Sequence, residues 1–131
     1  MPHFIVEYSA NLELVVDIEA LVTEVHHAAI ETGIFPLKGT RTRAVRRDNY
    51  RIADGHPENA FVHIFAKIGQ GRAAEIRQKA GQGIFNATRE FLRPYFESHP
   101  LALSFEMQEI DSGTSFKSNN LSEWIERRAR T

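Results

Sequence analysis

The second residue, Pro2, is a candidate general base. A small residue at this position favours enzymatic removal of Met1, which would leave proline as the N-terminus with a secondary amine in place of an amide. An ordinary α-amino group titrates at about 7.7–8.0, and burial or nearby cations lower such a pKa because both disfavour the ammonium form. A strand pattern begins at His3, so the ring nitrogen would be held on a rigid element. The alternative is that Pro2 is merely a tolerated second residue.

Two arginines, Arg41 and Arg72, are candidate carboxylate-binding residues. The planar guanidinium matches a carboxylate and stays charged at any working pH. Arg72 follows Gly69-Gln70-Gly71 at the expected start of a helix, a place that favours anions. The alternatives are a solvated strand edge for Arg41 and a surface arginine paired with Glu75 for Arg72. Arg43, two residues after Arg41, could take its place.

Other motifs predict no cofactor and no metal. The six histidines include no His-x-x-x-His and no tight cluster with acidic residues, and the adjacent pair His26-His27 points to different sides of a helix. The Gly69-x-Gly71 pattern is too short for a nucleotide-binding loop and lacks the P-loop lysine. Phe35, followed by a proline, is a loop aromatic that could either line a pocket or fill the core.

Composition and charge indicate a single globular domain. The chain has 131 residues, 42% of them hydrophobic, with no cysteine and a net charge of −1. This balance argues against a nucleic-acid partner. No apolar run approaches the roughly 18 residues of a membrane span, and the first residues lack the basic-then-apolar order of a signal peptide. We therefore expect a cytoplasmic protein without a membrane partner.

Hydrophobic periodicity predicts two strand–helix–strand units. The first has a strand over 3–8, a helix whose apolar stripe runs from Leu14 to Ala28 with Gly33 as its stop signal, and a strand over 40–47 that is polar enough for an edge. After a loop over 47–58, the second has a strand over 61–68, a helix from about 72 with a stripe from Ile76 to Phe91 that Pro94 ends or bends, and a strand over 101–107.

The repeated order predicts a two-layer α/β (α+β) fold. Residues 2–58 and 59–121 would form a duplicated β-α-β unit, with 122–131 as a C-terminal extension. Strands within each right-handed unit should be parallel, and the product is a four-stranded mixed sheet with two helices on one face. Several strand residues are apolar on both faces, so the uncovered face should meet another surface, most simply a second copy. These residues are Phe61, Val62, Ile64, Phe65, Leu101, Leu103 and Phe105.

An ordered set of motifs resembles a known family over nearly the whole chain. The set is Pro2-His3-Phe4-Ile5-Val6-Glu7, Gly33-Ile34-Phe35-Pro36-Leu37, Arg41, Ala53-Asp54-Gly55, Ala60-Phe61-Val62-His63, Lys67-Ile68-Gly69-x-Gly71-Arg72, Leu101-Ala102-Leu103-Ser104-Phe105-Glu106 and Phe116-Lys117-x-Asn119-Asn120. It is similar to the 5-carboxymethyl-2-hydroxymuconate isomerases of the tautomerase superfamily, which also contains 4-oxalocrotonate tautomerase and macrophage migration inhibitory factor.

The resemblance implies a cofactor-free isomerase. It implies a homotrimer of double β-α-β subunits, with Pro2 as the catalytic base and Arg41 and Arg72 as the matching arginines. The expected reaction is an allylic proton shift on 5-carboxymethyl-2-hydroxymuconate, in bacterial breakdown of homoprotocatechuate. The sequence leaves two rivals: keto–enol conversion of a smaller 2-oxo acid at the same site, and a non-enzymatic trimeric binding protein with an inert proline.

Overall fold

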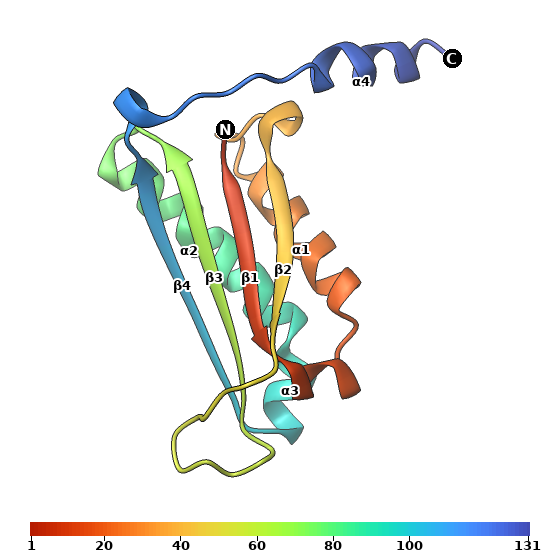
Figure 1. The fold of residues 1–131 in the computed structure, drawn as a ribbon, viewed down its shortest axis with the longest axis vertical. Coiled ribbons are helices and arrows are strands. Elements are labelled where there is room, and N and C mark those ends of the chain that lie inside the picture. Colours follow the sequence, from red (N-terminus) through yellow and green to blue (C-terminus); the bar gives the residue numbers. More distant parts are fainter.

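Two strand–helix–strand units form the molecule, and the computed structural model describes residues 1–131 (Figure 1). The first unit consists of β1 (His3–Ser9), α1 (Ile18–Glu31) and β2 (Arg41–Arg47). The second consists of β3 (Ala60–Gly69), α2 (Ala74–Phe91), a short helix α3 (Arg93–Ser98) and β4 (Leu101–Ile110). Short 3₁₀ turns at Ala10–Leu14, Leu37–Gly39 and Ser112–Thr114, and the C-terminal helix α4 (Leu121–Ala129), complete the chain.

The four strands form one mixed sheet in the order β2-β1-β3-β4. β1 pairs with β2 and β3 with β4 in parallel, whereas β1 and β3 are antiparallel where the two units meet. Helices α1 and α2 cover one face of this sheet (Figure 1). The fold is therefore the predicted duplicated β-α-β arrangement, and β2 is the edge strand that its polar sequence indicated.

Alternate residues of the inner strands form the core against the helices. Phe4 and Val6 of β1 and Val62 and Ile64 of β3 are fully buried, and the two helices contribute apolar residues to the same cluster. Fully burying a side chain of this size contributes about 1.5–3 kcal/mol relative to leaving it exposed. Because these strands carry the core, their ends, including residues 2 and 3, are held in defined positions.

The structure corrects the predicted start of the first helical stripe. Leu14 is 85% exposed and ends a separate 3₁₀ turn, in which Leu12 is the buried residue. The reason is a helix cap: the Asp17 carboxylate accepts the Ala20 N–H at 3.2 Å, so α1 begins at Ile18. The predicted stop is confirmed, since α1 ends just before Gly33, whose φ of +77° suits glycine.

The second helix also departs from its predicted stripe at one position. Ile76 is 47% exposed although it shares the spacing of the buried Ile84, because it faces the open hollow between α1 and α2. Pro94 acts as expected, since α2 ends at Phe91 and the chain restarts in α3 with a proline in the first turn. No helix combines the length and apolar character needed to cross a membrane.

The seven apolar strand residues are divided between the two faces of the sheet, as predicted. Leu101, Leu103 and Phe105 lie on the helix side, because they pair with the buried alternating residues of β3. Phe61 and Phe65 do lie on the open face. Their strand also places polar side chains there, such as His63, which contacts Ser104 and Glu106 of β4 at 2.6 and 2.8 Å.

Candidate active site

Pro2 is buried at the start of β1 and belongs to the sheet. Its carbonyl oxygen accepts the Arg41 N–H at 3.1 Å, which extends the β1–β2 ladder by one rung beyond the paired residues His3 and Arg41. The proline ring is therefore fixed, and Arg41 is the neighbouring residue on the adjacent strand. In this structure Met1 is present, so the terminal amine belongs to Met1 and the Pro2 nitrogen is part of an amide.

The environment of Met1 shows what surrounds the N-terminus. The Met1 sulfur lies 3.2 Å from Nδ2 of Asn119, and a methyl group placed on Gly39 would stand 3.7 Å from Met1 Cγ. The pKa of the terminal amine is lowered from its ordinary value, first by burial and then by the positive charges of Lys117, Arg41 and Arg72. Both predicted arginines therefore act on the N-terminus, together with a lysine from the far end of the chain.

Arg41 lies over His3 on the open face of the sheet. Its Nη2 is 2.9 Å from His3 Nε2, and Arg43 Nη1 is 3.0 Å from His3 Nδ1. Burial and the two guanidinium charges lower the pKa of His3, so the neutral ring is favoured. A neutral imidazole has one acceptor nitrogen, so it can accept from only one of the two arginines. The other guanidinium is left free to bind an anion, and Arg41 also has a buried Nε without a partner.

Arg72 is held near the N-terminus by two backbone carbonyl groups and an aromatic ring. Its two terminal nitrogens donate to the carbonyl oxygens of Ile34 and Gly69 at 2.8 and 3.2 Å. The guanidinium lies over the Phe35 ring, 5.1 Å from its centroid, and Phe35 in turn packs edge-on against Phe4. Phe35 is 4% exposed, so it belongs to the core, and its ring packs against the Arg72 guanidinium. Glu75 does not pair with Arg72, contrary to the surface alternative.

The cations near the N-terminus are not neutralised by acidic side chains. Arg41, Arg43, Arg72 and Lys117 have no carboxylate within 4.0 Å, in contrast to Arg46 and Arg47 at the other end of β2. Uncompensated positive charge at one end of the sheet attracts anionic ligands. The arrangement therefore suits a small molecule with several carboxylates.

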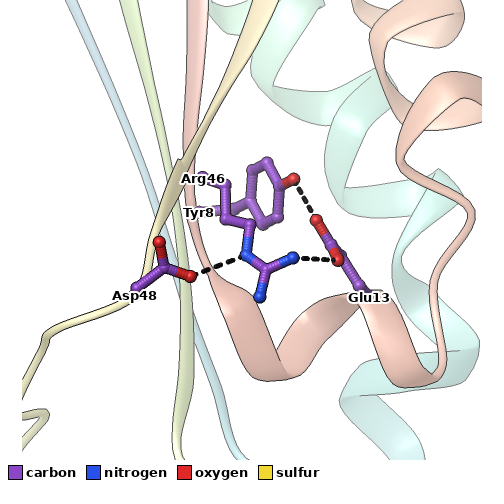
Figure 2. Close-up of polar contacts among 4 residues, drawn as sticks. All are labelled: Tyr8, Glu13, Arg46 and Asp48. Atoms are coloured by element: carbon purple, nitrogen blue, oxygen red, sulfur yellow. Dashed lines mark hydrogen bonds and ion pairs between the residues drawn. The ribbon is translucent and has the colours of Figure 1, made fainter.

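Figure 2 shows the contrasting, compensated end of the sheet. Arg46 donates to Glu13 at 2.9 Å and to Asp48 at 2.8 Å, and the Tyr8 hydroxyl donates to the same Glu13. Burial and the bond to Glu13 raise the pKa of Tyr8 to about 12. These contacts satisfy one another, so we interpret the group as structural.

The two largest of the hollows described lie away from the N-terminus. One of about 610 Å³ lies between α1 and α2, and another of about 490 Å³ lies between α2 and β4. Neither is lined by Pro2, Arg41 or Arg72. The chain also contains no group of three or more histidine or acidic side chains placed to hold a metal ion. The site is thus defined by its charges and its terminal amine.

The structure brings together the residues that the sequence singled out and adds two. Pro2, Arg41 and Arg72 meet at the N-terminus, with Arg43 beside Arg41 and Phe35 beneath Arg72. Sequence reasoning missed His3, whose contact with the arginines depends on the strand register. It also gave no role to Lys117, although this lysine belongs to one of the motifs that carried the resemblance.

Comparisons with known proteins agree on one family. The family model described as 5-carboxymethyl-2-hydroxymuconate isomerase matches residues 2–125. A 5-carboxymethyl-2-hydroxymuconate Delta-isomerase of Escherichia coli is 43% identical over 121 residues, which are 92% of this chain and 96% of the relative.

Solved structures are also similar. A 5-carboxymethyl-2-hydroxymuconate isomerase from Deinococcus radiodurans R1 has a TM-score of 0.86 at 32% identity, with 95% of this chain and 93% of that chain covered. A native fused 4-OT, at 15% identity and a TM-score of 0.68 over 95% of this chain and 99% of that chain, shares the fold. The chain belongs to the 5-carboxymethyl-2-hydroxymuconate isomerase family.

Proposed function

We propose that this isomerase converts 5-carboxymethyl-2-hydroxymuconate to its conjugated ketone, with the N-terminal proline as the base. The observation that carries the proposal is the position of the terminal amine, which is half-buried near three cations that have no acidic partner. The family and its closely similar Escherichia coli relative carry the same activity in their names. We also propose that the reaction takes place in the cytoplasm, during homoprotocatechuate breakdown.

The proposed reaction is a proton shift along a dienol. Once Met1 is removed, the Pro2 nitrogen takes the proton of the 2-hydroxyl group, and the oxygen lone pair forms the C2 carbonyl. The double bonds move from C2–C3 and C4–C5 to C3–C4, and the protonated Pro2 returns its proton to C5. Atoms and electrons balance without an oxidant, because the substrate's own carbonyl accepts the electrons. Positioned proton transfer of this kind contributes about 10²–10⁴-fold.

The arginines have different proposed roles. Arg41 lies beside the β1 strand that carries the base, so we assign it to the charge that develops on the 2-oxygen, an interaction that is stronger in the transition state. Arg72 is fixed by two backbone carbonyls and the Phe35 ring, so we assign it to a substrate carboxylate. Arg43, which contacts the same histidine, is the alternative candidate for the role assigned to Arg41.

The substrate assay tests this function. Protein whose mass confirms the loss of Met1 should turn over 5-carboxymethyl-2-hydroxymuconate with a higher kcat/KM than 2-hydroxymuconate, because the additional carboxylate meets a site with surplus positive charge. The ultraviolet absorbance of the dienol follows both reactions. A faster reaction with a 2-oxo acid that carries a single carboxylate would favour simple keto–enol conversion, and turnover of none of these compounds would contradict an enzymatic role.

We further propose that the chain works as a homotrimer. The open face of the sheet carries Phe61 and Phe65 without a covering layer, and a fused 4-OT with the same fold is a symmetric trimer. Sedimentation equilibrium should therefore give about three times the 14.9 kDa subunit mass. A stable and fully active monomer would contradict the proposal.

A further inference from the structure

The segment that follows β4 carries a third cation to the N-terminus. After β4 ends at Ile110, the chain runs past the N-terminus on its way to α4 (Figure 1). Lys117 lies on this segment, and its positive charge helps to lower the pKa of the terminal amine, so its side chain lies near the N-terminus. This segment, residues 112–119, follows the last strand of the second unit, so its lysine is an addition to the residues that the strands and their helices bring to the site.

Hydrogen bonds hold the 112–119 segment in place at both ends. The Ser112 N–H donates to the Gln70 side chain at 3.1 Å, which ties the segment to the turn between β3 and α2. Asn119 Nδ2 donates to the Lys38 carbonyl oxygen at 3.1 Å and lies 3.2 Å from the Met1 sulfur. Asn119 Oδ1 accepts the Leu121 N–H at 2.8 Å, where α4 begins. Lys117 is therefore positioned between two fixed points, close to the place where Met1 now lies.

The charge at Lys117 has no partner within the chain. No carboxylate lies within 4.0 Å of it, and the groups that act on the same terminal amine are Arg41 and Arg72, both positive. With Arg43, four uncompensated cations lie near the N-terminus, and a tricarboxylate dienol presents three carboxylates and a 2-oxygen that gains negative charge. A ligand with two carboxylates would leave one of the cations unpaired.

We propose that Lys117 binds the third carboxylate, the carboxymethyl group, and makes the site selective for tricarboxylates over dicarboxylates. The inference rests on the proposed function for the identity of the substrate, and on the geometry above for the subsite. Charge-assisted bonds of an ammonium to a carboxylate are about twice as strong as neutral ones. Removal of this contact should therefore lower the affinity for ligands that carry the third carboxylate more than the affinity for dicarboxylates.

The test compares Lys117→Ala and Lys117→Arg with the wild type, and uses Lys79→Ala, at an exposed lysine of α2, as the matched control. Isothermal titration with propane-1,2,3-tricarboxylate and with glutarate measures selectivity without turnover. Wild type, Lys117→Arg and the control should bind the tricarboxylate at least about tenfold more tightly than glutarate. Lys117→Ala should bind both with nearly equal affinity. An unchanged preference in Lys117→Ala, or an equal loss for both ligands, would overturn the inference.

Kinetics then separate this inference from the proposed function. With 5-carboxymethyl-2-hydroxymuconate, Lys117→Ala should raise KM by about tenfold, while KM for 2-hydroxymuconate changes less than about threefold. Rates are compared at a pH high enough for Pro2 to be fully deprotonated in every variant, so that a change in the pKa of Pro2 does not affect the comparison. A wild type that turns over neither compound, but whose preference for the tricarboxylate in titration is lost in Lys117→Ala, would refute the isomerase function and support the Lys117 subsite.

Discussion

A glutamine inserted between Met1 and Pro2 should abolish most of the activity while leaving the fold intact. Met1 is retained before glutamine, and the Pro2 nitrogen then stays an amide without a basic lone pair. We expect kcat/KM to fall by about 10²–10⁴-fold, the usual contribution of a positioned base. Stability should change little, because the structure already accommodates a residue before Pro2. Steady-state kinetics, a mass measurement and thermal unfolding provide the readouts.

The control for this variant is Pro2→Ala. It restores a free but primary amine, which has a different basicity and a more mobile position. Its kcat/KM should therefore fall far below the wild-type value, but it should equal or exceed that of the inserted variant. If the inserted variant, with its mass confirmed, turned over substrate at the wild-type rate, the proline nitrogen could not be the base.

Arg41→Ala and Arg72→Ala should both impair catalysis but in different ways. Arg41→Ala should lower kcat by about 10²-fold, because a donor at a developing oxyanion acts mainly in the transition state. Arg72→Ala should raise KM by about tenfold with kcat nearly intact, because a contact to a remote carboxylate is made equally in the ground state. Steady-state kinetics with the tricarboxylate substrate distinguish the two results.

Arg47→Ala is the matched control for both arginines. Arg47 lies on the same strand and face as Arg41 but pairs with Glu7 at 2.7 Å. Its loss should leave kcat and KM unchanged and shift stability by no more than about 0.5–1 kcal/mol, as exposed ion pairs do. If Arg41→Ala and Arg72→Ala both kept the wild-type kcat and KM, these arginines would be ordinary surface charges without a role in catalysis.

Periodicity in the sequence predicted the elements well because the core is regular. The inner strands β1 and β3 alternate between buried and more exposed residues, and the parallel pairing within each unit follows from the expected right-handed crossovers. The predictions were wrong where a local contact outweighed the pattern, as at Leu14, where the Asp17 cap starts the helix later. The face to which Leu101 and Leu103 point depends on pairing with β3, which alternation alone does not fix.

The candidate site could be predicted only in part, for a physical reason. Pro2 has distinctive chemistry of its own, and Arg41 and Arg72 are marked by their places in a strand and before a helix. Lys117 comes from a segment with no strand or helix of its own, and its approach to the N-terminus depends on the side-chain bonds of Asn119. A single sequence does not reveal such a long-range contact.

The pKa of the Pro2 nitrogen in the protein without Met1 tests the central claim most directly. A nitrogen-15 NMR titration of protein labelled at proline reports this pKa, and the pH dependence of kcat/KM reports the pKa of the base in the free enzyme. Burial and the three cations lower the pKa of the Met1 amine, and we expect the same groups to lower the pKa of the Pro2 nitrogen once Met1 is removed, so that the protonated, inactive form prevails only below the lowered value. We predict that kcat/KM falls as pH decreases through this value, is constant above it, and gives the same pKa as NMR. A Pro2 nitrogen that stays protonated at a pH where turnover is maximal would contradict the account.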